Sequence, residues 1–132
     1  MSERFPTSLI CDYAGRGEKN KHIAVGIYSG DILVAAFPAQ LKFAAYIEFY
    51  PPRSGDMKIE AFFSLNGTRT AGIIGKAMGV KDTEIAAMTV PSLDFNFQSP
   101  GTLDLYMRFD SDEPLLVRSK KVLLSPSPLP NA

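Results

Sequence analysis

One histidine and one cysteine limit the chemistry open to this chain. His22 is the only histidine and Cys11 the only cysteine. An activated nucleophile needs a base within hydrogen-bond reach, and a structural zinc site needs four ligands of these kinds. His22 could approach Cys11 and Asp12 if residues 8–14 pair with residues 22–28. Because free cysteine commonly behaves as a small core residue, we predict a buried thiol and a solvent-facing histidine at a strand start.

Four carboxylates near one predicted turn form a second candidate site. Calcium favours several oxygen ligands on a flexible loop, but no diagnostic ligand spacing occurs here. Aspartate is also common in hairpin turns for backbone reasons. We therefore predict no metal and no other cofactor, and keep a calcium site as the alternative at Asp104, Asp110, Asp112 and Glu113.

Aromatic side chains offer the strongest functional hint. Residues 42–50 and 58–65 read as paired strands, and the polar side of that pair carries charges of both signs together with Tyr46, Tyr50 and Phe62. Tyrosine-rich faces suit protein recognition, since aromatic rings bring contact area at low entropic cost. Cross-strand packing that stabilises an exposed sheet is the competing interpretation.

The elements that must position these residues are strands. Apolar residues occupy every second position in three long runs, so each run has one apolar face. Ile23, Val25 and Ile27 repeat the pattern in a shorter run. Several such ribbons can hide their apolar faces only against each other, which predicts an antiparallel β-sandwich. The three long runs are Leu41-Phe43-Ala45-Ile47-Phe49, Ile59-Ala61-Phe63-Leu65 and Leu103-Leu105-Met107-Phe109.

Turn signals divide the chain into about eight or nine short strands, a spacing typical of all-β sandwiches. Asn66-Gly67 predicts a tight hairpin turn between residues 58–65 and 68–74. Residues 75–83 read as a loop, and Pro91 separates two strands. Near the C-terminus, a turn at Pro100-Gly101 leads into a long strand that forms a hairpin with the last strand. This order favours an immunoglobulin-like arrangement, with a C2-like topology as the alternative.

Length and charge favour one domain without a nucleic-acid role. The chain has 132 residues, 14 basic and 14 acidic, with a formal net charge of +0. We expect residues 1–124 to form a single sandwich domain and residues 125–132 a proline-rich extended tail. Nucleic-acid binders usually carry a basic excess. Without a signal-like apolar segment near the start, we predict a cytoplasmic protein with no membrane partner.

A resemblance adds a family but no activity. The segments Ile10-Cys11-Asp12, Val25 to Val34 and Phe37-Pro38 resemble a family of small bacterial and phage proteins defined only as a domain of unknown function. The resemblance implies a β-sandwich and assigns no site residues. We therefore predict a non-enzymatic binding module that recognises a protein, with self-association open. The alternative is a calcium-dependent or small-ligand-binding sandwich, and the small-ligand form requires a sizeable pocket between the sheets.

Overall fold

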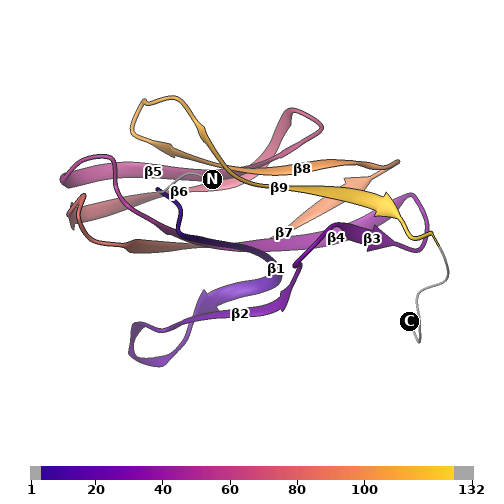
Figure 1. Ribbon diagram of the computed structural model, residues 1–132, viewed down its shortest axis with the longest axis horizontal. Coiled ribbons are helices and arrows are strands. Elements are labelled where there is room, and N and C mark those ends of the chain that lie inside the picture. Colours follow the sequence, from indigo (N-terminus) through magenta and orange to yellow (C-terminus); the bar gives the residue numbers. More distant parts are fainter. Residues whose placement is uncertain (1–3, 127–132) are drawn as a thin grey trace.

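Two facing β-sheets make up the molecule (Figure 1). The structure is a computed structural model that describes residues 4–126, without the side chain of residue 20. The described residues form nine strands and a short 3₁₀ helix, η1 (Glu18–Asn20). The strands are β1 (Thr7–Arg16), β2 (His22–Ile27), β3 (Ile32–Val34), β4 (Ala39–Phe49), β5 (Gly55–Leu65), β6 (Thr68–Val80), β7 (Ala86–Phe97), β8 (Gly101–Phe109) and β9 (Leu115–Leu124).

The strand order separates the chain into a four-stranded and a five-stranded sheet. The first runs β2-β1-β4-β7 and the second β3-β9-β8-β5-β6. Neighbouring strands are antiparallel except for β3 and β9, which pair in parallel. The prediction of an all-β, two-sheet fold is confirmed.

The core lies between the sheets and is rich in phenylalanine. The three alternating runs point inward as predicted, and the rings of Phe63 and Phe95 meet edge to face across the gap at 5.3 Å. Phe49 and Phe109 make a second contact between the sheets at 5.5 Å. Aromatic pairs in these geometries add stability beyond the area they bury.

The hairpin turn at Asn66-Gly67 is confirmed, but the following strand is longer than predicted. Asn66 and Gly67 have φ of 52° and 84°, the positive values that a type I′ turn needs. The loop predicted for residues 75–83 is wrong, since β6 continues to Val80. Its glycines belong to the strand: a Cβ at Gly72 would lie 2.4 Å from the carbonyl oxygen of Ala61. The close approach of β5 therefore requires glycine there.

Pro91 does not divide two strands, contrary to the prediction. Residues 86–97 form the single strand β7, in which Pro91 and Ser92 together lie opposite Ala44. This β-bulge absorbs the extra residue. β7 is an edge strand, and an edge position tolerates a residue without an N–H donor.

Small side chains let β1 cross over β4. β1 pairs with β4 only as far as Cys11, which lies opposite Ala44. Beyond that point β1 also contacts β7, and the Ser92 hydroxyl donates a hydrogen bond to the carbonyl oxygen of Asp12. Because β4 lies between β1 and β7, the second half of β1 passes over its outer side. Cys11, Ala14 and Ala44 fill the crossing and are all buried.

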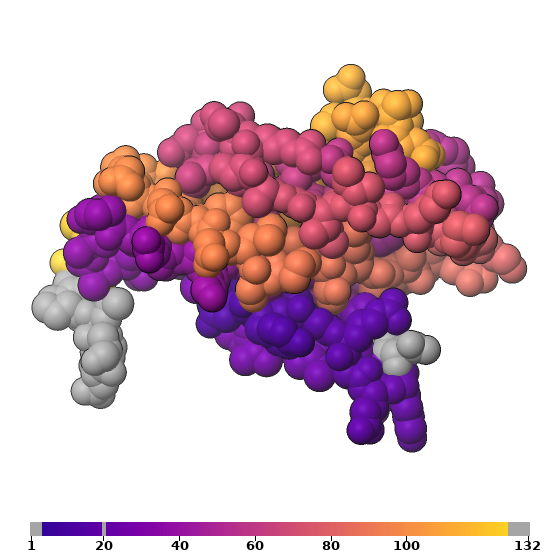
Figure 2. Space-filling view, turned by 180° about the vertical axis from the view of Figure 1, so that it is seen from behind, coloured from indigo at the N-terminus to yellow at the C-terminus, as the bar shows by residue number. Residues whose placement is uncertain are grey.

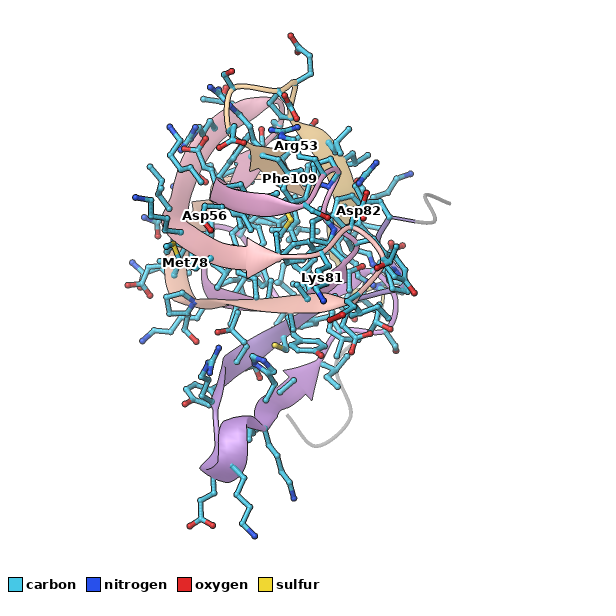
Figure 3. The ribbon with its side chains drawn as sticks, turned by 90° about the vertical axis from the view of Figure 1, so that its left-hand side faces the viewer. Arg53, Asp56, Met78, Lys81, Asp82 and Phe109 are labelled. Carbon is cyan, nitrogen blue, oxygen red and sulfur yellow. The ribbon has the colours of Figure 1, made fainter. Side chains whose placement is uncertain are left out.

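The second half of β1 and the whole of β2 form a hairpin that stands off the sandwich (Figures 1 and 3). We call residues 12–27 the N-terminal hairpin. At the other end of the molecule, the N–H of Ser125 donates to the carbonyl oxygen of Val34 at 2.8 Å. Most of the predicted proline-rich tail, residues 127–132, lies outside the described residues.

Replacing Ala44 with leucine tests the crossing. The larger side chain has no room between β1 and β4, so we expect Ala44→Leu to lower the free energy of unfolding by about 1–3 kcal/mol in urea denaturation. Ala36→Leu, at an exposed position, is the matched control and should stay within about 0.5 kcal/mol of the parent protein. Equal stability of the two variants would contradict the tight crossing.

Candidate interaction surface

The three predicted face residues do not share a face. β4 pairs with β1 and β7, whereas β5 pairs with β6 and β8, so the predicted pairing of residues 42–50 with 58–65 is wrong. Tyr46 and Tyr50 belong to the four-stranded side and Phe62 to the five-stranded side. Tyr46 and Phe62 both alternate with core residues, which directs them to opposite outer sides of the sandwich.

Phe62 is part of a packed stack. Its side chain is only 7% exposed, and its ring lies parallel to that of Tyr106 at 5.3 Å. The guanidinium of Arg69 lies over the Phe62 ring, 4.3 Å from its centroid, and also pairs with Glu60. The hydrogen bond from Arg69 lowers the pKa of Glu60. At Phe62, cross-strand packing therefore describes the contacts better than an open recognition face does.

Tyr46 and Tyr50 are half-buried and held by local contacts. The Tyr46 hydroxyl donates to Glu48 at 2.7 Å, and burial together with this hydrogen bond raises the pKa of Tyr46 to about 12. The Tyr46 ring lies 5.2 Å from that of His22. The carbonyl oxygen of Arg4 accepts the Tyr50 N–H at 2.8 Å, and the Arg4 guanidinium donates to the carbonyl oxygen of Tyr50 at 3.0 Å. Tyr46 thus supports the N-terminal hairpin.

Two carboxylates of the predicted calcium site share an arginine, and a third lies far from them. Arg53 contacts Asp110 at 2.6 Å and Asp112 at 2.9 Å, at the end of the sandwich that faces the viewer in Figure 3, where Arg53 is labelled in the upper part. Asp104 accepts the Ser119 hydroxyl at 2.5 Å and lies six residues from Asp110 along β8, roughly 20 Å away. Glu113 is exposed. In residues 4–126 no three His, Cys, Asp or Glu side chains gather as metal ligands would.

The structure separates His22 from Cys11. Cys11 lies opposite Ile27 and His22 opposite Arg16, at the two ends of the β1–β2 ladder. The thiol is buried as predicted, and this burial raises the pKa of Cys11. His22 starts β2 as predicted, but it is only partly exposed. His22 packs against Tyr46, and its Nδ1 is buried without a hydrogen-bond partner.

The N-terminal hairpin carries an apolar surface that faces solvent. Its inner side packs Ala14 and Ala24 against Ala44. Its outer side exposes four large apolar side chains, which we call the hairpin face. They are Tyr13 (51% exposed), Ile23 (45%), Val25 (55%) and Ile27 (50%).

The hairpin face is continuous because of the ladder register. Tyr13 lies directly opposite Val25 and Gly15 opposite Ile23, and cross-strand partners share a side. Ile27 extends the exposed run along β2, opposite the buried Cys11. The Tyr13 ring leans over Gly15, where a Cβ would come 2.4 Å from its hydroxyl. The parity of Ile23, Val25 and Ile27 was visible in the sequence. It was indistinguishable there from a core-facing strand.

β2 also offers an open strand edge. Among residues 4–126 it is bonded to β1 alone, so its other edge has no partner strand. Figure 2 shows the indigo and violet segment standing out from the lower side of the molecule. An apolar edge strand of this kind is a ready template for pairing with another chain.

A scan against protein-family models and a search of curated proteins find no match to this chain. The family resemblance and the bacterial or phage origin therefore stay predictions. In the described part of the chain, no helix has the length and apolar character needed to cross a membrane.

Arg53→Met tests the ion pairs that hold the two aspartates. The hydrogen bonds from Arg53 and the Lys58 backbone lower the pKa of Asp110. Because that pKa is lower when folded, the carboxylate adds stability above its unfolded value of about 3.9, and this stability is lost as the pH falls through the folded pKa. We expect the melting temperature of the parent protein to exceed that of Arg53→Met at about pH 7, and this difference to vanish at about pH 2.

Circular dichroism melts across this range give the measurement. Lys121→Met, which removes an exposed cation from β9, is the control and should show no such pH-dependent gap. A difference in melting temperature between the parent protein and Arg53→Met that stays constant with pH would contradict the claim that Arg53 lowers the pKa of Asp110.

Proposed function

We propose that the protein is a non-enzymatic recognition module that binds an extended segment of a partner protein along β2. The observation that carries the proposal is the hairpin face beside an open strand edge. An added strand would gain main-chain hydrogen bonds from the edge and specificity from the side chains that alternate along it. This retains the predicted protein recognition and moves it away from Tyr46, Tyr50 and Phe62.

The hairpin face leaves apolar side chains in contact with water, which is unfavourable unless a partner covers them. Single exposed apolar residues are ordinary, but contiguous apolar patches usually mark interaction sites. Three of the four side chains belong to one six-residue strand. An incoming strand with apolar residues at every second position would cover them and complete the sheet.

The finer topology that we propose is immunoglobulin-like. The order β1-β4-β7 in one sheet corresponds to strands A, B and E of that fold, and β5, β8 and β9 correspond to C, F and G. β6 beside β5 corresponds to the C′ strand of the variable type. β2 has no counterpart in this scheme, which makes the N-terminal hairpin an addition to the sandwich.

A displayed library of short random peptides tests the recognition mode. We expect selected peptides to carry apolar residues at alternate positions and to slow hydrogen exchange at the β2 amides. The double variant Ile23→Asp/Val25→Asp should weaken their binding by roughly tenfold or more, because it replaces two apolar contact side chains with carboxylates. Both positions are exposed, so the fold should remain intact.

The opposite edge supplies the matched control. Ile74 and Met78 on β6 are 63% and 67% exposed, and Figure 3 shows Met78 at the rim of the five-stranded sheet. Ile74→Asp/Met78→Asp should leave peptide binding unchanged. Equal loss in both double variants, or no loss in the β2 variant, would contradict the proposal. Sedimentation of the free protein separates self-pairing of β2 from binding of a different chain.

A further inference from the structure

The open edge of β2 borders a hollow on the outer side of the four-stranded sheet. The hollow has a volume of about 500 Å³ and is lined by Leu9 and Tyr46 from that sheet and by Lys21 to Ala24 at the start of β2. Among the described residues, none from the second half of β1 lines it, so it lies on the side of β2 that has no partner strand. A strand added to β2 would run over the hollow and shield Leu9 and Tyr46 from water.

The sequence along β2 is symmetric in residue type about Val25. The segment His22-Ile23-Ala24-Val25-Gly26-Ile27-Tyr28 begins and ends with a ring, has isoleucine next to each end, and carries a small residue on each side of the central valine. In an antiparallel pair of two such strands centred on Val25, Ile23 lies opposite Ile27 of the second copy and Val25 lies opposite itself. Directly opposite side chains share a side and contact each other. The strand is therefore complementary to a copy of itself.

The other side of β2 also suits this register. His22 would lie opposite Tyr28 of the second copy, and Ala24 opposite Gly26. The backbone of Gly26 has a φ of 70°, a value found in glycine bulges, so the strand is distorted at this residue. Because alanine faces the distorted position, no large side chain has to fit there.

The charges at the two ends of β2 have opposite sign. Lys19 and Lys21 precede the strand and Asp31 follows it, and all three side chains are exposed. Within residues 4–126 none of the three forms an ion pair. Glu18 is the one carboxylate among residues 16–21, which also include Arg16. A two-fold rotation brings the start of one strand beside the end of the other, so cations of one copy approach a carboxylate of the second copy.

We propose that the extended segment bound along β2 is β2 of a second copy of this chain, paired antiparallel about a two-fold axis at Val25. The proposal rests on the recognition function of β2 and names its partner. The two N-terminal hairpins then form one continuous sheet in the order β1-β2-β2-β1. Tyr13 flanks Val25 on one side, and Val25 of the second copy flanks it on the other. Both copies contribute the same surface, as a two-fold contact requires.

Sedimentation velocity of the full chain tests the self-pairing. One strand from each copy makes a small contact, so we expect a dimer with a dissociation constant on the order of 10–100 μM. The mass should rise from that of the monomer toward that of the dimer across this range. Hydrogen exchange at the β2 amides should slow as the dimer forms, because pairing at the edge bonds them.

Variants of Val25 test the axis, because this residue lies opposite itself only in the proposed register. Val25→Asp and Val25→Lys each bring two like charges together, and each should weaken dimerisation at least about tenfold. An equimolar mixture of the two variants should dimerise again, since aspartate then faces lysine. Val25 is 55% exposed, so both variants should fold. Met78→Asp on β6, where the side chain is 67% exposed, is the matched control and should leave dimerisation unchanged.

Four outcomes would overturn the self-pairing. They are a parent protein that stays monomeric at about 500 μM, a dimer whose β2 amides exchange at the monomer rate, equal loss of dimer in Met78→Asp, and failure of the mixed Val25 variants to associate. Peptide selection separates this proposal from the recognition function. A monomeric protein that still selects alternating peptides along β2 contradicts self-pairing alone, whereas a protein that neither dimerises nor selects peptides contradicts both.

Discussion

The contact between Cys11, Ala14 and Ala44 is the constraint on which the hairpin face depends. Two strands can cross at backbone distance only where their side chains are small, and these three side chains are fully or almost fully buried at the crossing. The crossing turns β1 out of its sheet, toward the bulge at Pro91 and Ser92. A larger residue at any of these positions would push the N-terminal hairpin away from the sandwich.

The position of the hairpin gives its two sides different properties. The inner side packs Ala14 and Ala24 on Ala44, and His22 on Tyr46. The outer side leaves a tyrosine and three β-branched side chains in solvent beside an unpaired strand edge. The aromatic contacts between the sheets hold the framework beneath them, and that framework needs no disulfide, since Cys11 is the only cysteine.

The layers of the fold could be predicted from alternation, and the site could not. From Leu103 to Phe109, every second residue is apolar in the sequence and buried in the structure, because successive side chains of a strand point to opposite faces. Alternation does not say which strands pair, so Tyr46 and Phe62 were placed on one face although their strands lie in different sheets. Ile23, Val25 and Ile27 alternate like core residues, and only the crossing at Ala44 turns them outward. The length of β6 was missed because its glycines serve close packing, which a single sequence does not reveal.

The central claim is that β1 crosses over β4 and so carries the N-terminal hairpin to a position where His22 packs on Tyr46. A two-dimensional nuclear Overhauser spectrum measures this directly, because the single histidine gives one resolved set of imidazole signals. With ring centroids 5.2 Å apart, the imidazole protons should show cross-peaks to the ring protons of one tyrosine. Those cross-peaks should disappear in Tyr46→Leu. Their absence from the folded parent protein, or their survival in Tyr46→Leu, would contradict the account.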